Sequence, residues 1–302
     1  TPGLARNYFE ENLADLPARP PHLHIGAYPY PTETIREFVK PLARVLLLEE
    51  GYPYVERALR GIVPPDGLEI RGRESGAVPP DGELNPDIVR AALGLPARKG
   101  LTLAGPPLPN RPPQLCAGCP HGDSFHSITD ALAAFSDAVV TADIGCSTLG
   151  ALPPYNAIQT CVCMGASVGM AKGAADAGYH PVVAVIGDST FLHSGVTPLM
   201  DAVAADTPMT LLILDNKTVA MTGGQPTIRR SSELEGVVRG LGINPDHVCV
   251  LDAHPRNVAE NTEVLRREVD HRGLSVIIAV RECIETAKRS RQEKSVAAAE
   301  GA

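Results

Sequence analysis

Aromatic side chains are scarce in this sequence. Its 302 residues include no tryptophan, and aromatic residues together make up only 4%. Proteins that bind single-stranded nucleic acid stack bases on aromatic side chains and attract the backbone with basic patches. The formal net charge here is −8 at pH 7, so an overall basic character is missing as well. We therefore expect no nucleic-acid partner.

Long apolar runs are also missing. No stretch reaches the roughly 18 apolar residues that a membrane-spanning helix needs, and an acidic chain has no basic footprint for an anionic membrane surface. The first residues, Thr1-Pro2-Gly3, resemble neither a signal peptide nor an initiator methionine. We expect no membrane partner, a cytoplasmic location, and a sequence that is either a fragment or a processed product.

The seven cysteines are too few for a disulfide scaffold in a chain of this size. Their clustering instead indicates metal or redox chemistry in a reducing compartment. They occupy positions 116, 119, 146, 161, 163, 249 and 283.

Length and alternation of elements predict two domains. The first, residues 1–95, reads as a small and incomplete α/β domain. We expect its strands at 22–25, 44–48 and 68–71, and its helices at 8–16, 32–41, 54–61 and 86–93. Residues 96–113 hold most of a proline-rich stretch, which predicts an extended connector.

Residues 114–285 form the second predicted domain. Its expected strands are 138–142, 182–186, 209–214, 247–251 and 275–280; its expected helices are 124–135, 164–177, 194–205, 232–239 and 257–271. The strands are short, continuous apolar runs, which is typical of strands covered on both faces. The pattern predicts a doubly wound, mostly parallel sheet of the α/β class. Residues 286–302 form a charged tail, which we expect to be solvated or disordered.

The stretch 181–225 is predicted to contain a strand, a helix and a second strand, so that both following loops emerge at one edge of the sheet. Asp188 and Asn216 lie in these loops and offer the oxygen ligands that Mg²⁺ prefers. Gly187, Ser189 and Thr190 precede a helix, where free backbone N–H groups favour an anion. A metal–phosphate site is one interpretation. Ordinary loop chemistry is the other, because Gly, Asp and Asn favour turns for local reasons.

Four cysteines are predicted to converge at that same edge. Cys116 and Cys119 form a C-x-x-C loop, whereas Cys146 and Cys283 each follow a predicted strand. Four thiolates indicate zinc or an iron–sulfur cluster, and the isolated positions of the last two favour a cluster. Structural zinc at the C-x-x-C, or reduced thiols with the others buried, stays open. We expect Cys249 in the core, and local packing for the cysteines at 161 and 163.

Two histidines have positions that suggest contact with a ligand. His121 follows the C-x-x-C loop, and His193 lies five residues beyond Asp188. A structural role is the alternative for each. We expect His126 on a helix surface.

Taken together, several motifs resemble the thiamine-diphosphate domain of the 2-oxoacid:ferredoxin oxidoreductases, and within that family its indolepyruvate branch. The motifs are Leu115-Cys116-Ala117-Gly118-Cys119-Pro120-His121, Asp143-Ile144-Gly145-Cys146, Leu152-Pro153-Pro154, Cys163-Met164-Gly165-Ala166-Ser167, Gly187-Asp188-Ser189-Thr190-Phe191, His193-Ser194-Gly195, Leu214-Asp215-Asn216 and Met221-Thr222-Gly223-Gly224-Gln225. The resemblance covers nearly all of residues 112–285, and the first domain resembles the small linker domain that precedes it in that family.

The resemblance implies a set of site residues. Mg²⁺ would be bound by Asp188, Asn216 and the backbone carbonyl of Thr218. The residues implied to line thiamine diphosphate are Gly145, Cys146, Gly165, Gly187, Asp188, Ser189, Thr190, Asn216, Thr218, Met221 and Thr222. A 4Fe-4S cluster would be held by Cys116, Cys119, Cys146 and Cys283. The sequence departs from the usual fingerprint at Ser189, where glycine is usual, and at Asp215, where asparagine is usual.

The activity implied by the resemblance is oxidative decarboxylation of an arylpyruvate to an acyl-coenzyme A, with electrons passed to the cluster and on to ferredoxin. The family's pyrimidine-binding domain and its ferredoxin-like domain have no counterpart here, so we expect partner chains or domains: one that supplies the pyrimidine-binding half, and a beta/gamma-type subunit. Two alternatives remain. The chain could be the cofactor half of a non-oxidative 2-oxoacid decarboxylase, or a non-catalytic assembly subunit with structural zinc.

Overall fold

The computed structural model describes residues 1–63, 67–100, 105–106, 109–228 and 231–300. The chain divides into two compact units, Thr1–Leu108 and Pro109–Ala302. Among the described residues, no helix combines the length and apolar character that crossing a membrane requires.

The first unit is built on a two-stranded parallel sheet, with β1 (Arg44–Leu46) beside β2 (Glu69–Arg71). Its helices are α1 (Ala5–Glu10), α2 (Thr32–Val39), α3 (Tyr54–Ile62) and α4 (Pro86–Ala92). Two apolar clusters fill it, one around Ile35 and Leu59 and the other around Phe9 and Val89. The strand expected at 22–25 is reduced to a single bridge between Pro2 and Ile25. The helix expected at 8–16 is instead α1 and a 3₁₀ turn, Leu13–Asp15.

The second unit contains a six-stranded sheet in the order β4-β3-β5-β6-β8-β7, and every neighbouring pair is parallel. The strands are β3 (Val139–Ala142), β4 (Thr160–Cys161), β5 (Val182–Gly187), β6 (Thr210–Asp215), β7 (Val248–Asp252) and β8 (Ser275–Val280). From β3 the sheet continues to β4 on one side and to β5, β6, β8 and β7 on the other. This is a doubly wound topology, as the apolar strands predicted.

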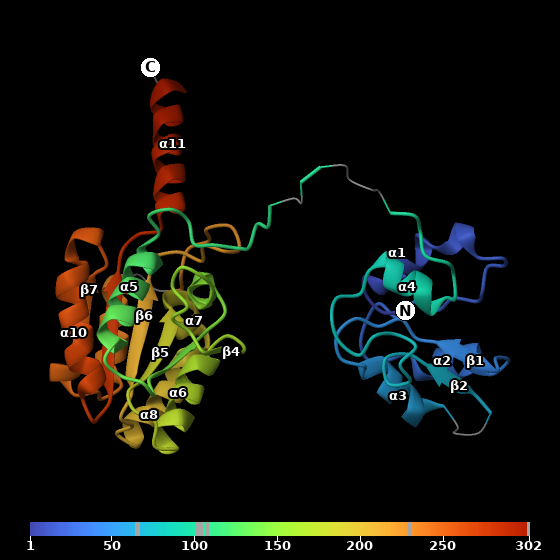
Figure 1. Ribbon diagram of the computed structural model, residues 1–302, viewed down its shortest axis with the longest axis horizontal. Helices are drawn as coiled ribbons and strands as arrows, with labels where there is room; N and C mark the ends of the chain where they lie inside the picture. The colour runs from blue at the N-terminus through green and yellow to red at the C-terminus, as the bar shows by residue number, and fades with distance from the viewer. Residues whose placement is uncertain (64–66, 101–104, 107–108, 229–230, 301–302) are drawn as a thin grey trace. The chain divides into compact units, whose positions relative to one another are not determined.

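Helices cover both faces of this sheet (Figure 1). Their bounds are α5 (Pro120–Leu132), α6 (Ala166–Asp176), α8 (Val196–Ala204), α9 (Ser231–Gly240) and α10 (Val258–Asp270). Side chains alternate along each strand, so Ala184 and Ile186 pack against α6 and α8, whereas Val183 and Val185 pack against α5 and α10. Burial on both faces explains why the strands read as continuous apolar runs.

Several elements differ from their predicted bounds. Helix α5 begins at Pro120 rather than 124, because proline is well suited to the first position of a helix. The helix after β5 begins at once, as α7 (Asp188–Thr190) followed by a π-helical turn (Phe191–Gly195). The short strand β4 was not predicted. The charged tail forms helix α11 (Ile284–Glu300), which extends away from the sheet (Figure 1).

Candidate metal and cofactor site

Asp188 lies at the carboxyl end of β5 and is 6% exposed. Its Oδ1 accepts a hydrogen bond from the backbone N–H of Ser189 (2.7 Å), and its Oδ2 accepts one from the N–H of Lys217 (3.1 Å). Burial, followed by the charge of neighbouring Asp215, raises the pKa of Asp188 to about 7. A cation at this position would relieve both effects.

Asn216 lies in a tight turn directly after β6. Lys217 has a left-handed backbone conformation (φ +65°), and the Asn216 Oδ1 accepts a hydrogen bond from the Thr218 N–H at 3.1 Å. The Thr218 hydroxyl donates to the carbonyl oxygen of Gln225 at 3.0 Å, which ties the turn to the following glycine loop. Asn216 and Thr218 are 7% and 3% exposed. The sequence therefore buries two oxygen-bearing residues beside Asp188.

The donor set of these two loops fits a hard divalent cation. The Lys217 N–H spans the gap between the loops, so the Asp188 carboxylate lies next to the Asn216 turn. The Ser189 hydroxyl is buried, and among the described residues it has no hydrogen-bond partner. Buried polar groups normally have one. An unsatisfied hydroxyl beside a carboxylate and an amide oxygen is consistent with a ligand that binds here.

The loop after β3 and the start of α6 lie at the same carboxyl edge of the sheet. The Asp143 carboxylate is fully buried and accepts hydrogen bonds from the N–H (2.9 Å) and hydroxyl (2.8 Å) of Ser167. Gly165 has φ +85°, and a Cβ there would lie 2.5–2.8 Å from Ser194. Only glycine therefore fits this close approach between α6 and the π-helical turn. Gly145, before Cys146, has φ +150°.

The four cysteines of the predicted cluster line one cavity of about 270 Å³. Cys116 and Cys119 come from the loop before α5, Cys146 from the turn after β3, and Cys283 from the segment after β8. Asn216 lines the same cavity, and its carbonyl oxygen accepts a hydrogen bond from the Cys283 N–H at 3.0 Å. The structure thus brings together all four thiols and connects them to the Asn216 turn.

The thiols are close enough to influence one another's pKa values. Burial, and then the neighbouring thiols, raises the pKa of Cys146 to about 11, and burial also raises the pKa of Cys119. Among the described residues, no three of these sulfur atoms lie within 4.8 Å of one another. Thiolates around a single zinc would be about 3.8 Å apart, given a Zn–S bond of about 2.3 Å. In this structure the thiols are therefore farther apart than the ligands of a bound zinc ion.

Arg281 fixes the position of the C-x-x-C loop relative to β8. Its guanidinium donates to the Asp123 carboxylate at 2.5 Å, to the Ala253 carbonyl at 3.2 Å and to the Gly118 carbonyl at 3.3 Å. Gly118 lies between the two loop cysteines, and Arg281 lies two residues before Cys283. Sequence reasoning did not single out Arg281 or Asp143, although Asp143 follows a strand at the same edge as Asp188.

The two histidines differ in their surroundings. His121 is 5% exposed, burial lowers its pKa to about 4, and its Nε2 lies 3.4 Å from the Asn216 Nδ2. It is therefore neutral at pH 7 and accepts a hydrogen bond from that amide. His193 is exposed and contacts Ser194 at 3.2 Å. His126 is exposed on α5, as expected.

The remaining predicted residues surround the same edge. Gly187 ends β5, and Thr190, just after it, is buried. Met221 is 61% exposed and lines the cysteine cavity. The Thr222 hydroxyl donates a hydrogen bond to the Gln225 side chain at 2.7 Å. Cys249 is half-buried in β7 rather than fully in the core.

Comparison with known proteins shows what this chain is similar to. Residues 143–279 match the family described as thiamine pyrophosphate enzyme, C-terminal TPP binding domain. Indolepyruvate oxidoreductase subunit IorA of Archaeoglobus fulgidus is 36% identical over 97% of this chain and 49% of its own length. IorA of Methanothermobacter marburgensis is also 36% identical, over 93% of this chain and 48% of its own length. The chain thus spans about half the length of these relatives.

A comparison of folds agrees with the predicted fold class. A structure of 2-oxoglutarate:ferredoxin oxidoreductase from Magnetococcus marinus, with 2-oxoglutarate, coenzyme A and succinyl-CoA bound, superposes with a TM-score of 0.50 at 17% identity. It covers 58% of this chain and 66% of that protein. The predicted α/β fold and the resemblance seen in the motifs are confirmed.

Proposed function

We propose that this chain, a relative of the IorA subunits over almost its whole length, is the thiamine-diphosphate-binding part of an indolepyruvate-type 2-oxoacid:ferredoxin oxidoreductase. The observation that carries the proposal is the single cavity lined by Cys116, Cys119, Cys146, Cys283 and Asn216. A thiol cluster directly beside the metal-binding turn is what a decarboxylase needs if it is to remove electrons from its product. A non-oxidative decarboxylase has no use for one.

The Mg²⁺ site in this proposal consists of the Asp188 carboxylate, the Asn216 Oδ1 and the backbone carbonyl of Thr218. Mg²⁺ takes few protein ligands and keeps its other positions for water and phosphate oxygens. Asp188 and Asn216 would offer the metal oxygen lone pairs beyond those that accept from the N–H groups of Lys217 and Thr218. The Ser189 hydroxyl gains an acceptor in the diphosphate.

The four cysteines hold a 4Fe-4S cluster as thiolates. The raised pKa values of Cys119 and Cys146 describe these thiols without a metal, and metal ligation requires the deprotonated thiolate. Bound thiamine diphosphate would supply the electron sink for loss of CO₂ from the 2-oxoacid. Cys283 and Asn216 share a backbone hydrogen bond, so the electron-accepting side of the site is connected directly to the metal-binding side.

The proposal includes further partners. Coenzyme A is the acyl acceptor, ferredoxin takes the electrons, and the enzyme works in the cytoplasm. A partner chain or domain supplies the pyrimidine-binding half, together with a beta/gamma-type subunit. The proposal assigns contact with the substrate to Met221 and His193, whose side chains are exposed.

Iron and sulfide analysis after anaerobic purification and reconstitution tests the cluster. We expect four irons and four sulfides per chain, consistent with a 4Fe-4S cluster, and visible absorption that is lost in Cys146→Ser. Cys163→Ser is the matched control, because Cys163 is exposed and outside the cavity, and it should retain full iron. A colourless wild-type chain that holds one zinc instead would refute the cluster and favour an assembly role.

Calorimetry of thiamine diphosphate binding, with the pyrimidine-binding partner present, tests the metal site. We expect Asp188→Asn to abolish Mg²⁺-dependent binding. Asp201→Asn is the control, because this exposed carboxylate on α8 lies outside the predicted site. Unchanged affinity in Asp188→Asn would contradict the assignment.

A further inference from the structure

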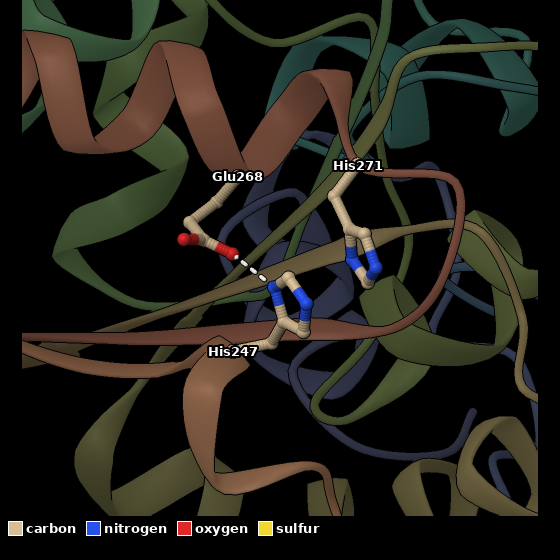
Figure 2. Close-up of side chains that lie close together, drawn as sticks. All are labelled: His247, Glu268 and His271. Atoms are coloured by element: carbon tan, nitrogen blue, oxygen red, sulfur yellow. Dashed lines mark hydrogen bonds and ion pairs between the residues drawn. The ribbon is translucent and has the colours of Figure 1, made fainter.

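A second group of metal-ligating side chains lies at the opposite edge of the sheet. His247 ends a 3₁₀ turn just before β7, Glu268 lies in the last turns of α10, and His271 follows that helix. One possible donor atom from each residue lies within 4.8 Å of the other two. Figure 2 shows the two imidazoles side by side, with the Glu268 carboxylate hydrogen-bonded to His247. Nothing in the proposed decarboxylation uses these residues.

The hydrogen bonds determine which imidazole nitrogens are available. Glu268 is ionised and can only accept, so the His247 Nδ1–H donates to its Oε2 at 2.9 Å. The Ser275 hydroxyl donates its one proton to the same oxygen at 2.8 Å. Its oxygen must therefore accept from the His271 Nδ1–H at 3.1 Å. Both neutral imidazoles then keep an unprotonated Nε2, which is the form that binds metals.

Glu268 gives this group its negative charge. It is 1% exposed, and although burial raises its pKa, the hydrogen bonds from His247, Arg267 and Ser275 together lower it below the usual value. Arg267 pairs with Oε1 at 2.8 Å and is mostly exposed, so Oε2 is the oxygen on the histidine side. Carboxylates that hydrogen-bond a ligating histidine are a common feature of metal sites, where they fix its tautomer and orientation.

The His271 ring packs against Gly273 and fills the space that a side chain at position 273 would need. A Cβ at position 273 would lie 2.8 Å from the His271 Cε1, 3.2 Å from its Nε2 and 3.2 Å from the Asp206 Oδ1. A second carboxylate thus borders the same space. The His247 and His271 rings are stacked, with their centroids 3.5 Å apart and an interplanar angle of 7°. A single ion can therefore reach both Nε2 atoms once one ring turns out of the stack.

We propose that His247, His271 and Glu268 form a binding site for a divalent transition-metal ion, with Zn²⁺ as the preferred occupant. Two imidazoles and one carboxylate suit zinc, whereas Mg²⁺ and Ca²⁺ prefer sites made only of oxygen ligands. The ion would link α10 to the amino ends of β7 and β8, at the far edge from the cofactor. The site is structural, and it is independent of the proposed decarboxylase function.

Zinc content after equilibrium dialysis tests this site. The untagged, chelator-treated and reduced chain is dialysed against Zn²⁺ and then analysed for metal. The cysteines also take up zinc, so the informative quantity is the difference between variants. We expect His247→Gln and His271→Gln each to bind one zinc fewer per chain than wild type, and His126→Gln to bind the same number. Equal zinc content in wild type and both glutamine variants would overturn the proposal.

A second measurement on the unmodified chain guards against a variant that fails to fold. In imidazole ¹H–¹⁵N spectra, Zn²⁺ added beyond the amount that the cysteines bind should shift the Nε2 signals of two histidines together. The thermal midpoint should rise with zinc in wild type and in His126→Gln. If no pair of histidine signals moves as zinc is added, the site does not exist.

Discussion

The buried His121 leads to a quantitative prediction about acid stability. The imidazole is 5% exposed and neutral, and it accepts a hydrogen bond from the Asn216 amide. Burial lowers its pKa to about 4 in the folded chain, whereas an unfolded histidine has a pKa of about 6.5. Below pH 6.5 the unfolded state therefore binds a proton that the folded state excludes. The resulting loss of stability grows as the pH falls towards 4.

The size of this effect follows from the two pKa values. The full difference of about 2.5 units corresponds to an upper limit of about 3.4 kcal/mol, reached below pH 4. At pH 5 the proton linkage amounts to about 2 kcal/mol, and at pH 7 it is close to zero. For a unit of this size, about 2 kcal/mol lowers the melting temperature by roughly 4–8 °C.

Calorimetric unfolding at pH 7 and pH 5 measures this linkage. Glutamine at position 121 offers the Asn216 amide an acceptor without titrating, so His121→Gln should lose about 2 kcal/mol less than wild type between the two pH values. Other titrating groups cancel in the comparison. His126→Gln, on the exposed face of the same helix, should behave like wild type. If His121→Gln loses as much stability as wild type, the folded chain accommodates a charged His121 and the assignment is wrong.

Two further predictions concern residues that hold the site in shape. Gly165→Ala should lower the free energy of unfolding by about 2 kcal/mol or more in thermal unfolding, because φ is +85° and the new Cβ would meet Ser194. Gly169→Ala is the control and should not destabilise the chain, because its Cβ would meet nothing within 4 Å. Arg281→Met should reduce the iron retained per chain after reconstitution, and Asp123→Asn should cause a smaller loss. The double variant should lose no more iron than Arg281→Met alone. Full iron retention in Arg281→Met would show that the C-x-x-C loop keeps its position without this arginine.

The strand pattern predicted the sheet and the edge that holds the candidate site. A parallel sheet puts the residues after each strand at one edge, which is why Asp188, Asn216 and Cys146 could be placed together from sequence. The strand β4 escaped prediction because two residues carry no periodicity. The first domain was predicted less well at 22–25, where a single backbone bridge replaces a strand.

Side-chain environments within the site could not be predicted in the same way. The depth of His121 depends on the start of α5 at Pro120, four residues earlier than the apolar pattern indicated. The role of Arg281 depends on contacts with Asp123 and Gly118, which are more than 150 positions away in the sequence. Polar contacts between residues far apart in the sequence leave no periodic pattern in it, so they can be identified only in the folded chain.

The local hydrogen bonds also alter the expected way of holding a phosphate. A helix N-terminus was expected to offer free N–H groups to the anion, but the Ser189 N–H already donates to Asp188, and the N–H groups that open α6 donate to Asp143. Carboxylates thus occupy the donors that a diphosphate would use, and Asp215 adds a further negative charge beside Asp188. An anion entering this edge would meet net repulsion unless a cation lies between it and the carboxylates. In the proposed function, the divalent metal would therefore be what makes diphosphate binding possible, rather than an accessory to a preformed anion site.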